Sequence, residues 1–496
     1  MNSELIIVGG GLGGLVSGII LAKEGYSVCI LEKNHQAGGN LQSFTRDGHK
    51  FSTGLHYIGS MDEGQTLHRL FKYIGIAGKI PLKKMDDTGY ERITVGDDDT
   101  VYRHAMGWEN FSQTLIRQFP EEREAISHYV DNISEAIKGI PLYHLENAFS
   151  YNMDPHQLNR CTMAFLRSLT KDERLQSILA GANSIYHGAA MRTPFYLHAC
   201  IRNSFVNSAW RINSGSDKLA GALLEAFTDA GGTIITDAQV DRFEFDGDKI
   251  SAALLKDGRR FAGKHFISNL HPAATMQLIP HDRIRRVFRQ RIESMENTAG
   301  FFTLYLVFKK DFFPYLNYNH FHYFSDDYFR DLLPDDQWPQ TYLVYTPFYE
   351  ENPGFTPTAS ILSFMKYDEY KQWDGLAPDQ RGQGYYDFRE MAAQRLLNAV
   401  EKRYPGIRNG IEKHYVSTPL TFTDFTGTAH GSGYGVLKDC ENPARSIILP
   451  RTKIPNLFFT GQNLNIHGVL GTTINAVITC AEFTGFRYLV NKIIHV

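Results

Sequence analysis

The apolar and polar positions of the first thirty residues follow a strand–helix–strand pattern. Leu5 to Val8 is wholly apolar, which predicts a short, buried parallel strand. Leu15, Ile19 and Ala22 then recur at helical spacing, and Gly25 is placed to end that helix. Ser27 to Leu31 predicts a second strand. This order predicts a βαβ unit at the start of the chain.

A glycine-rich loop joins the first strand to the helix and fits the pattern G-x-G-x-x-G. Gly9 permits the sharp turn, Gly11 lets backbone amides approach a pyrophosphate, and Gly14 allows the helix to pack closely on the sheet. Glu32 stands at the end of the second strand, where a carboxylate can accept both ribose hydroxyls of an adenosine. Because strand, loop, helix and acid arrive in order, we predict a dinucleotide site here.

Two later regions continue the same alternation of helix and strand. Leu219, Leu223 and Phe227 mark one face of a helix, and strands follow at 233–236 and on either side of the turn at 246–248. A further strand ends at Asn269, and an apolar strand at 456–459 runs into Thr460. The aromatic-rich stretches 301–306, 312–315 and 342–348 predict core strands, some of which we expect to line an apolar cavity.

Composition limits the classes of protein and partner. With 496 residues, 43% apolar and 21% charged, the chain is long enough for two or more folded domains. A net charge of -3 argues against a nucleic-acid partner. No window holds the roughly 20 apolar residues of a membrane span, and the run from Leu5 to Ala22 is interrupted by glycines. We expect a cytoplasmic protein with, at most, a peripheral membrane contact.

Cysteine and histidine positions do not predict a metal site. The five cysteines are far apart and form no CxxC pair, so we expect reduced thiols in packed positions. His320 and His322 have strand spacing that places both imidazoles on one face, but no third ligand accompanies them.

Beyond Glu32, the glycine pair Gly38-Gly39 resembles the extended fingerprint of the flavin amine oxidase and phytoene desaturase superfamily. The regions 211–272 and 456–476 are similar to two further segments of that superfamily. The resemblance implies FAD as the cofactor, with Val240 lending its backbone to the adenine. Asn40 and Gln462 replace charged residues that the superfamily often uses, an Arg and an acid. The helix opening at Gly468 would direct its first amides at the flavin.

The cofactor-binding residues predicted in this way are Gly9, Gly11, Leu12, Gly13, Gly14, Glu32, Lys33, Gly38, Gly39, Asn40, Leu41, Val240, Gly461, Gln462, Gly471, Thr472 and Ile474. The implied fold is α/β. A Rossmann-type FAD-binding domain comes from 1–75, 210–275 and 410–496. A mixed α+β substrate domain with an antiparallel sheet comes from 76–209 and 276–409, and Met106 to Tyr151 is expected to form a helical lid.

The stretch 48–59, with its Gly-Leu-His-Tyr-Ile-Gly core, resembles the retinol saturase (all-trans-retinol 13,14-reductase) branch of the phytoene desaturase and carotenoid isomerase family. This implies an oxidoreductase acting on carbon–carbon double bonds of an isoprenoid or related lipid, by saturation more than by desaturation or isomerisation. His56 and Tyr57 would lie near the flavin, where either can deliver a proton.

Three points stay open at this stage. No second G-x-G-x-x-G follows a strand, so the electron partner can be a transiently bound NAD(P)H, a quinone or a carrier protein. A flavin amine oxidase is an alternative activity, which predicts an aromatic pair and a lysine at the flavin. A non-catalytic prenyl-lipid carrier, similar to the Rab GDP-dissociation inhibitors, is another alternative, although the intact glycine loop and Glu32 argue against it. The sequence does not indicate an oligomeric state.

Overall fold

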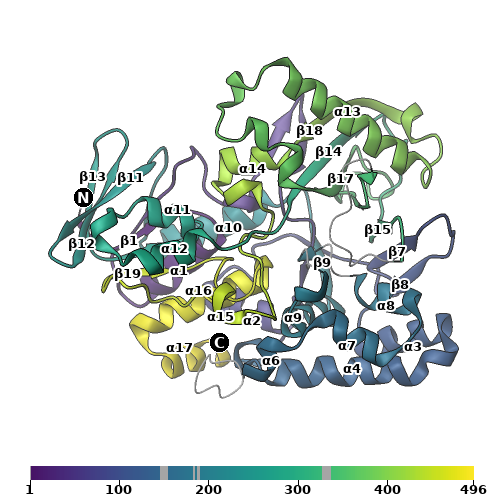
Figure 1. Cartoon of the computed structure of the whole chain (residues 1–496), viewed down its shortest axis with the longest axis horizontal. Helices are drawn as coiled ribbons and strands as arrows, with labels where there is room; N and C mark the ends of the chain where they lie inside the picture. The colour runs from purple at the N-terminus through teal and green to yellow at the C-terminus, as the bar shows by residue number, and fades with distance from the viewer. Residues whose placement is uncertain (1, 146–154, 182–184, 187–189, 327–336) are drawn as a thin grey trace.

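Two main β-sheets organise the molecule, and segments far apart in the sequence contribute strands to each of them (Figure 1). The computed structural model describes residues 2–145, 155–181, 185–186, 190–326 and 337–496. The fold is α/β, as the sequence predicts, with helices packed on both sheets.

The first sheet is built around the N-terminal βαβ unit. Its order is β10-β2-β1-β13-β12-β11, and β19 also pairs with β13. The strands are β1 (Asn2–Val8), β2 (Val28–Leu31), β10 (Thr233–Ile235), β11 (Val240–Asp246), β12 (Lys249–Leu255), β13 (Arg260–Ser268) and β19 (Leu457–Phe459). Strands β10, β2, β1, β13 and β19 are parallel, whereas the β11–β12 hairpin is antiparallel. The strands that the sequence predicts for this sheet are therefore present, whereas the stretch 312–315, predicted as a core strand, is a turn with one isolated β-bridge at Pro314.

Both faces of this sheet are covered, which explains why residues 5–8 of β1 are apolar without alternation. Leu5 and Ile7 face a core formed with the helices α1 (Leu12–Lys23), α10 (Asp217–Asp229) and α16 (Gly468–Thr484). Ile6 and Val8 face a second core, formed with the hairpin, α11 (Pro272–Gln277) and α12 (Arg286–Glu293).

The register of the parallel strands brings their carboxyl ends to one edge. Val8 is level with both Leu31 and Ser268, and Ser268 is level with Phe459. The residues that follow these four strands therefore meet there, which is where ligands bind in open α/β sheets.

The second sheet runs β18-β14-β17-β16-β15-β7-β8. Its strands are β7 (Glu91–Val95), β8 (Tyr102–His104), β14 (Gly300–Phe308), β15 (Asn319–Tyr323), β16 (Thr341–Tyr345), β17 (Thr358–Met365) and β18 (Ile411–Ser417). Neighbours are antiparallel except β15 and β7, which are parallel. In β14, Phe302 and Leu304 face α13 (Gly382–Glu401), whereas Phe301 and Tyr305 face the N-terminal part of the chain. This alternation follows the two-residue period of a strand.

Most helices between residues 108 and 207 gather on the side of this sheet away from α13 (Figure 1). They are α3 (Trp108–Gln118), α4 (Arg123–Lys138), α5 (Pro141–His144), α6 (Pro155–Asn159), α7 (Thr162–Leu169), α8 (Glu173–Leu179) and α9 (Phe195–Asn207). The expected lid, Met106 to Tyr151, corresponds to α3, α4 and α5, and its residues 146–151 lie outside the described residues.

Smaller elements join the two sheets. They are η1 (Gly39–Leu41), β3 (Ser43–Arg46), β4 (His49–Ser52), β5 (Ile58–Gly59), α2 (Thr66–Ile74), β6 (Leu82–Lys84), β9 (Ala209–Ile212), α14 (Pro419–Thr426), α15 (Pro443–Ser446) and α17 (Phe486–Ile494). Strand β9 pairs with both β5 and β6.

We propose a division into two domains close to the one predicted from the sequence. Strands of the first sheet come from 1–75, 210–275 and 410–496, and strands of the second come largely from the two remaining segments. Strand β18 pairs with β14 although it lies within 410–496, so we place the start of the third segment after Ser417. In the described part of the chain, no helix is both long and apolar enough to cross a membrane.

Candidate functional site

The glycine loop occupies the edge where the parallel strands end. Gly9 has a φ of 98°, which makes the sharp turn out of β1. A Cβ on Gly14 would lie 2.1 Å from the carbonyl oxygen of Gly9, and a Cβ on Gly13 would lie 2.6 Å from Cα of Gly461. A side chain at either position would force the backbone apart. The loop therefore packs against the end of β19, so the first and last predicted segments meet.

Glu32 lies beside this loop at the end of β2. Its Oε2 accepts a hydrogen bond from the backbone N–H of Gly10 (2.8 Å), and its Oε1 accepts one from Asn34 (2.9 Å). Each carboxylate oxygen has two lone pairs, so each can accept one more hydrogen bond. The carboxylate is thus held in place with acceptor capacity left for a ligand hydroxyl.

The second glycine pair continues the loop toward the rest of the chain. The N–H of Gly38 donates to the carbonyl oxygen of Gly10 (2.8 Å), and a Cβ on Gly39 would lie 3.2 Å from Cα of Gly11. Asn40 follows in η1, and its carbonyl oxygen is 3.2 Å from the position of a Cβ on Gly54. These close backbone approaches form a continuous path from the sheet edge to the region of 53–59.

The remaining predicted residues of the nucleotide site differ in what their side chains do. Leu12 begins α1 and Leu41 is buried in the core beside it. Lys33 donates through Nζ to the carbonyl oxygen of Asp424 (2.8 Å), so its side chain ties β2 to α14. Val240 is buried at the start of β11, where Ala238 donates to the carbonyl oxygen of Glu32.

The sequence reasoning missed Asn269, which immediately follows β13. Its Nδ2 donates to the carbonyl oxygen of Gly9 (3.3 Å), and its Oδ1 lies 2.5 Å from the position of a Cβ on Gly13 and 2.4 Å from that on Gly461. One amide side chain therefore fills the space between the two glycine loops. A polar residue directly after an apolar strand was the available signal.

These residues fit a flavin nucleotide. The glycines form a cradle that Cβ atoms would fill, and the Oδ1 atom of Asn40 is buried without a hydrogen-bond partner. Gln462 is half-buried directly after Gly461. Backbone amides at a helix start favour a pyrophosphate, and unpaired acceptors favour ligand hydroxyls. The first residues of α1 would hold the pyrophosphate, and Glu32 the adenosine ribose.

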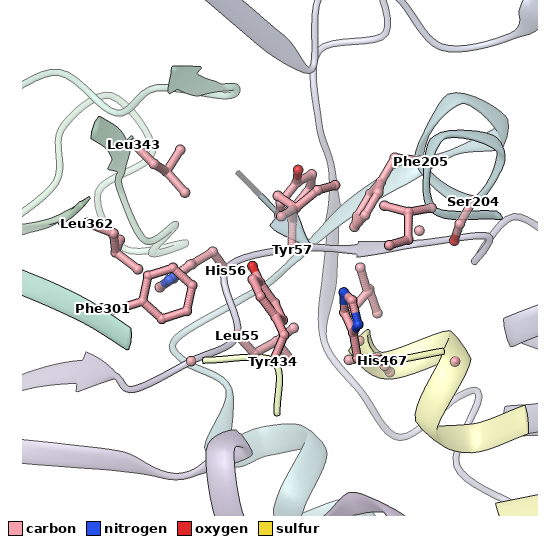
Figure 2. Close-up of a pocket in the computed structure, with 18 of the residues that line it drawn as sticks. Leu55, His56, Tyr57, Ser204, Phe205, Phe301, Leu343, Leu362, Tyr434 and His467 are labelled. Atoms are coloured by element: carbon pink, nitrogen blue, oxygen red, sulfur yellow. The ribbon is translucent and has the colours of Figure 1, made fainter. Parts of the chain in front are cut away.

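A cavity of about 140 Å³ lies where the path from Asn40 ends. Residues 53–59, α9, β14, β16, β17 and the first turn of α16 line it. Figure 2 shows Leu343, Leu362 and Phe301 on one side, with His56 beside them, and Phe205 on the other, with His467 below it and Tyr434 in the middle. Within the part of the chain that the structure describes, the lining includes no Asp, Glu, Lys or Arg.

His56 enters this cavity without a protein partner for either ring nitrogen. Both Nδ1 and Nε2 are buried, and the ring lies 4.7 Å from that of Tyr345. Burial, together with the nearby Arg211 guanidinium, lowers the pKa of His56 to about 3. The imidazole is therefore neutral at neutral pH, with one N–H and one lone pair available to a ligand.

The hydroxyl group of Tyr57 is not free to donate a proton to a ligand, because it is already bound within the protein. Its hydroxyl donates to Oε1 of Glu91 (2.7 Å), and its ring stacks on Phe205 at 4.2 Å. Burial and the Glu91 carboxylate raise the pKa of Tyr57 well above 10. Delivery of a proton by His56 or Tyr57 stays a prediction. At neutral pH, burial leaves His56 without the second proton of an imidazolium, and the raised pKa makes Tyr57 a weaker acid than a free tyrosine.

His467 and the start of α16 form the floor of the cavity. Both nitrogens of His467 are buried without a partner, its ring lies 4.7 Å from that of Tyr434, and burial lowers its pKa to about 3. Gly471 lines the cavity, and Thr472 and Ile474, one and three residues further along the helix, are buried. The first turn of this helix therefore borders the cavity, and the direction of its amides toward a flavin stays a prediction.

Arg211 is the charged group behind this cavity that the sequence reasoning did not single out. It is fully buried, and it donates to the carbonyl oxygens of Thr346 and Tyr318 and to Oδ1 of Asn319 (3.1 Å). Its guanidinium lies 4.8 Å from the Tyr345 ring that contacts His56. No carboxylate among the described residues forms a salt bridge with it, so it leaves positive potential near His56.

The histidine pair on β15 has a structural role. Oγ1 of Thr94 lies 2.9 Å from both Nε2 of His320 and Nδ1 of His322, so the two imidazoles share one face. His320 also contacts the hydroxyl of Tyr404 (2.7 Å). Over the residues that the structure describes, no group of three or more His, Cys, Asp or Glu is arranged to hold a metal ion.

The family profile described as "Flavin containing amine oxidoreductase" matches residues 12–481. All-trans-retinol 13,14-reductase of Danio rerio is 23% identical over 97% of this chain and 85% of its own length. 4,4'-Diaponeurosporene oxygenase of Staphylococcus haemolyticus is 24% identical over 94% of each chain. An oxidoreductase from Methanosarcina mazei superposes with a TM-score of 0.66, at 15% identity, over 96% of this chain and 99% of that one.

The match covers nearly the whole chain, from the end of the glycine loop at Leu12 onward, and it includes Glu32, the cavity and the first turn of α16. The paired loops at the sheet edge fit the nucleotide that such a family uses. The chain belongs to the family of flavin-containing amine oxidoreductases, and it is a flavin-dependent enzyme.

Proposed function

We propose that the protein binds FAD and transfers hydrogen to or from a carbon–carbon double bond of a hydrophobic isoprenoid or related lipid, with saturation as the favoured direction. The apolar lining of the cavity carries this proposal. An uncharged polyene is held by aromatic and aliphatic contacts. Leu343, Leu362, Phe301 and Phe205 supply such contacts from both sides (Figure 2).

The size of the cavity is consistent with a reacting segment rather than a whole long lipid. About 140 Å³ is less than the roughly 300–1,000 Å³ of ordinary small-molecule pockets. A second cavity of about 680 Å³ borders Gly39 and Asn40 and shares Thr53 with the first. Its lining includes Arg46 and Glu390, so it suits an apolar chain less well.

The flavin would supply two-electron transfer as a hydride. In the proposed reaction, the chain excludes water, holds the double bond flat between apolar side chains, and presents a neutral His56 to the ligand. His56 can hold a proton on one ring nitrogen and accept a hydrogen bond on the other. For saturation, electrons would come from a transiently bound NAD(P)H, whereas in the desaturation direction a quinone would accept them. A lipid substrate would reach the protein through a peripheral membrane contact.

An amine oxidase fits the cavity less well. Tyr434 and Phe301 do form an aromatic pair, with ring centroids 5.5 Å apart. However, no lysine is found among the described lining residues, and no carboxylate faces a cationic amine there. The buried Arg211 guanidinium behind His56 adds unfavourable charge. A non-catalytic prenyl-lipid carrier would not need the intact flavin cradle.

Anaerobic photoreduction of the flavoprotein tests the proposal. We expect flavin absorbance to return on mixing with all-trans-retinol or a carotenoid, but not on mixing with a quinone. Reoxidation by the quinone alone would overturn saturation in favour of desaturation. Reduction of the oxidised flavin by a primary amine would establish an amine oxidase, and a protein that stays colourless after FAD is added would indicate a carrier.

A further inference from the structure

Two cysteines that are far apart in the sequence lie together in the fold. The Sγ atoms of Cys161 and Cys440 are 2.9 Å and 3.5 Å from the same atom, the carbonyl oxygen of Met191. The two thiols also hydrogen-bond to each other. They are therefore close enough to react with one another.

The backbone holds both cysteines against one short segment. The N–H of Cys440 donates to the carbonyl oxygen of Arg192 (2.8 Å), and that of Thr162 donates to Thr193 (2.9 Å). Cys161 also forms a β-bridge with Pro194. Consecutive residues of the segment 192–194 bind the backbone at both cysteines. The two thiols therefore face each other without a rearrangement of the helices.

The two sulfur atoms differ in chemistry. Cys161 is half-exposed and directly precedes α7. Its pKa is lowered to about 6 by a hydrogen bond from the Cys440 thiol and by hydrogen bonds from the backbone N–H groups of Ala164 and Met163. Cys440 is only 4% exposed, and the neighbouring Cys161 together with burial raises its pKa. The Met191 carbonyl can accept from whichever thiol keeps its proton. Since the thiolate is the nucleophile, Cys161 is the attacking group and Cys440 the resolving one.

We propose that Cys161 and Cys440 form a reversible disulfide in response to a peroxide. The Cys161 thiolate attacks one peroxide oxygen, the O–O bond breaks, and a sulfenic acid forms as water leaves. Sγ of Cys440 then attacks the sulfenic sulfur, the S–O bond breaks, and a second water leaves. Two thiols lose two electrons and two protons, and hydrogen peroxide is reduced to two waters.

The bond would link two parts of the molecule that ion pairs already join. Arg192 forms salt bridges with Asp439 (2.7 Å) and Glu296 (2.8 Å). Nearby, the hydroxyl of Tyr196 on α9 donates to the carbonyl oxygen of Asn465 (3.3 Å). Helix α9 is one wall of the cavity, so the disulfide would fasten this wall to the chain that leads into α16.

Peptide mapping of the full flavoprotein tests the proposal. After brief exposure to a small excess of hydrogen peroxide, free thiols are blocked with N-ethylmaleimide and the protein is digested with trypsin. We expect the peptide of residues 161–167 to be joined to that of 439–445 in most molecules, and dithiothreitol to release it. Cys200, on the peptide of residues 193–202, serves as an internal control and should stay alkylated.

Two matched variants assign the roles. In Cys440→Ser, dimedone should trap a sulfenic acid on Cys161. In Cys161→Ser, Cys440 should stay at least tenfold less reactive toward iodoacetamide at pH 7 than Cys161 is in the wild type. Full alkylation of both residues after peroxide treatment of the wild type, or oxidation of Cys161 beyond the sulfenic acid without a cross-link, would overturn the proposal.

Discussion

At the scale of single residues, protonation is decided by surroundings that are distant in the sequence. His56 would titrate near pH 6.5 in water. Burial and the Arg211 guanidinium instead bring its pKa to about 3, and burial acts in the same way on His467. The residues predicted as catalytic are present at the cavity, but their acid strengths differ from what their types suggest.

The first residue-scale prediction concerns the side chains of His56 and Tyr57. If the N–H of neutral His56 delivers the proton, His56→Gln, which keeps a hydrogen-bond donor but cannot transfer a proton, should slow flavin reoxidation by the polyene about 100-fold. Tyr57→Phe should slow it less than about tenfold, because the Tyr57 hydroxyl is bound to Glu91. Stopped-flow absorbance measures both rates, and a larger loss in Tyr57→Phe would contradict the assignment.

The pH dependence follows with a definite sign. An imidazolium acid would lose activity as pH rises through its pKa, whereas a histidine with a pKa of about 3 is neutral from pH 5 to 8. The profile of the wild type should therefore show no fall caused by His56 over this range. His56→Gln should have the same shape at a lower rate. A limb near pH 6.5 that the substitution removes would show that His56 acts as an imidazolium.

At the scale of elements, two helical glycines with opposite surroundings make a matched pair. On Gly13 in α1, a Cβ would lie 2.6 Å from Cα of Gly461, whereas on Gly221 in α10 it would meet nothing within 4 Å. Gly13→Ala should cost about 1–3 kcal/mol of unfolding free energy and reduce bound flavin. Gly221→Ala should stabilise by about 0.5–1 kcal/mol through helix propensity.

Denaturant unfolding and the flavin-to-protein absorbance ratio measure these effects. The second variant controls for any general effect of alanine in a helix. Equal flavin content in the two variants would show that the contact between the loop after β1 and the end of β19 does not shape the nucleotide site.

At the scale of the whole molecule, a buried ionic network joins the helices to the second sheet. Glu91 on β7 binds Arg202 of α9 and His104 of β8, both at 2.8 Å, and accepts from Tyr57. Burial alone would raise the pKa of Glu91, but Arg202 and His104 outweigh it and hold that pKa at about 2. Glu91 is therefore charged at neutral pH although it is fully buried.

Removing one member of this network should cost more than removing two. Arg202→Met leaves a buried carboxylate without its cation, so we expect a loss of about 3–5 kcal/mol. Adding Glu91→Gln removes that charge and should recover part of the loss, which a double-mutant cycle by urea unfolding measures. Additive losses would show that the two side chains are not coupled.

Short-range patterns in the sequence were sufficient to predict the βαβ unit, the hairpin and the glycine loop. Each of these features depends on residues two to five positions apart, because strand and helix periodicity and turn geometry are local. The order of Gly9, Gly14 and Glu32 along the chain therefore predicts a dinucleotide site. The resemblance carried by Gly38-Gly39 and the two later segments predicts the flavin family, which the match over residues 12–481 confirms.

Contacts between distant segments depended on the register of the sheets and on the packing of helices against them. Register places Asn269 between Gly13 and Gly461, and α9 brings Arg202 to Glu91. The same packing opposes Cys161 and Cys440, which look like isolated thiols along the chain. No local pattern in the sequence encodes these contacts, because each contact depends on the way in which many strands and helices pack together.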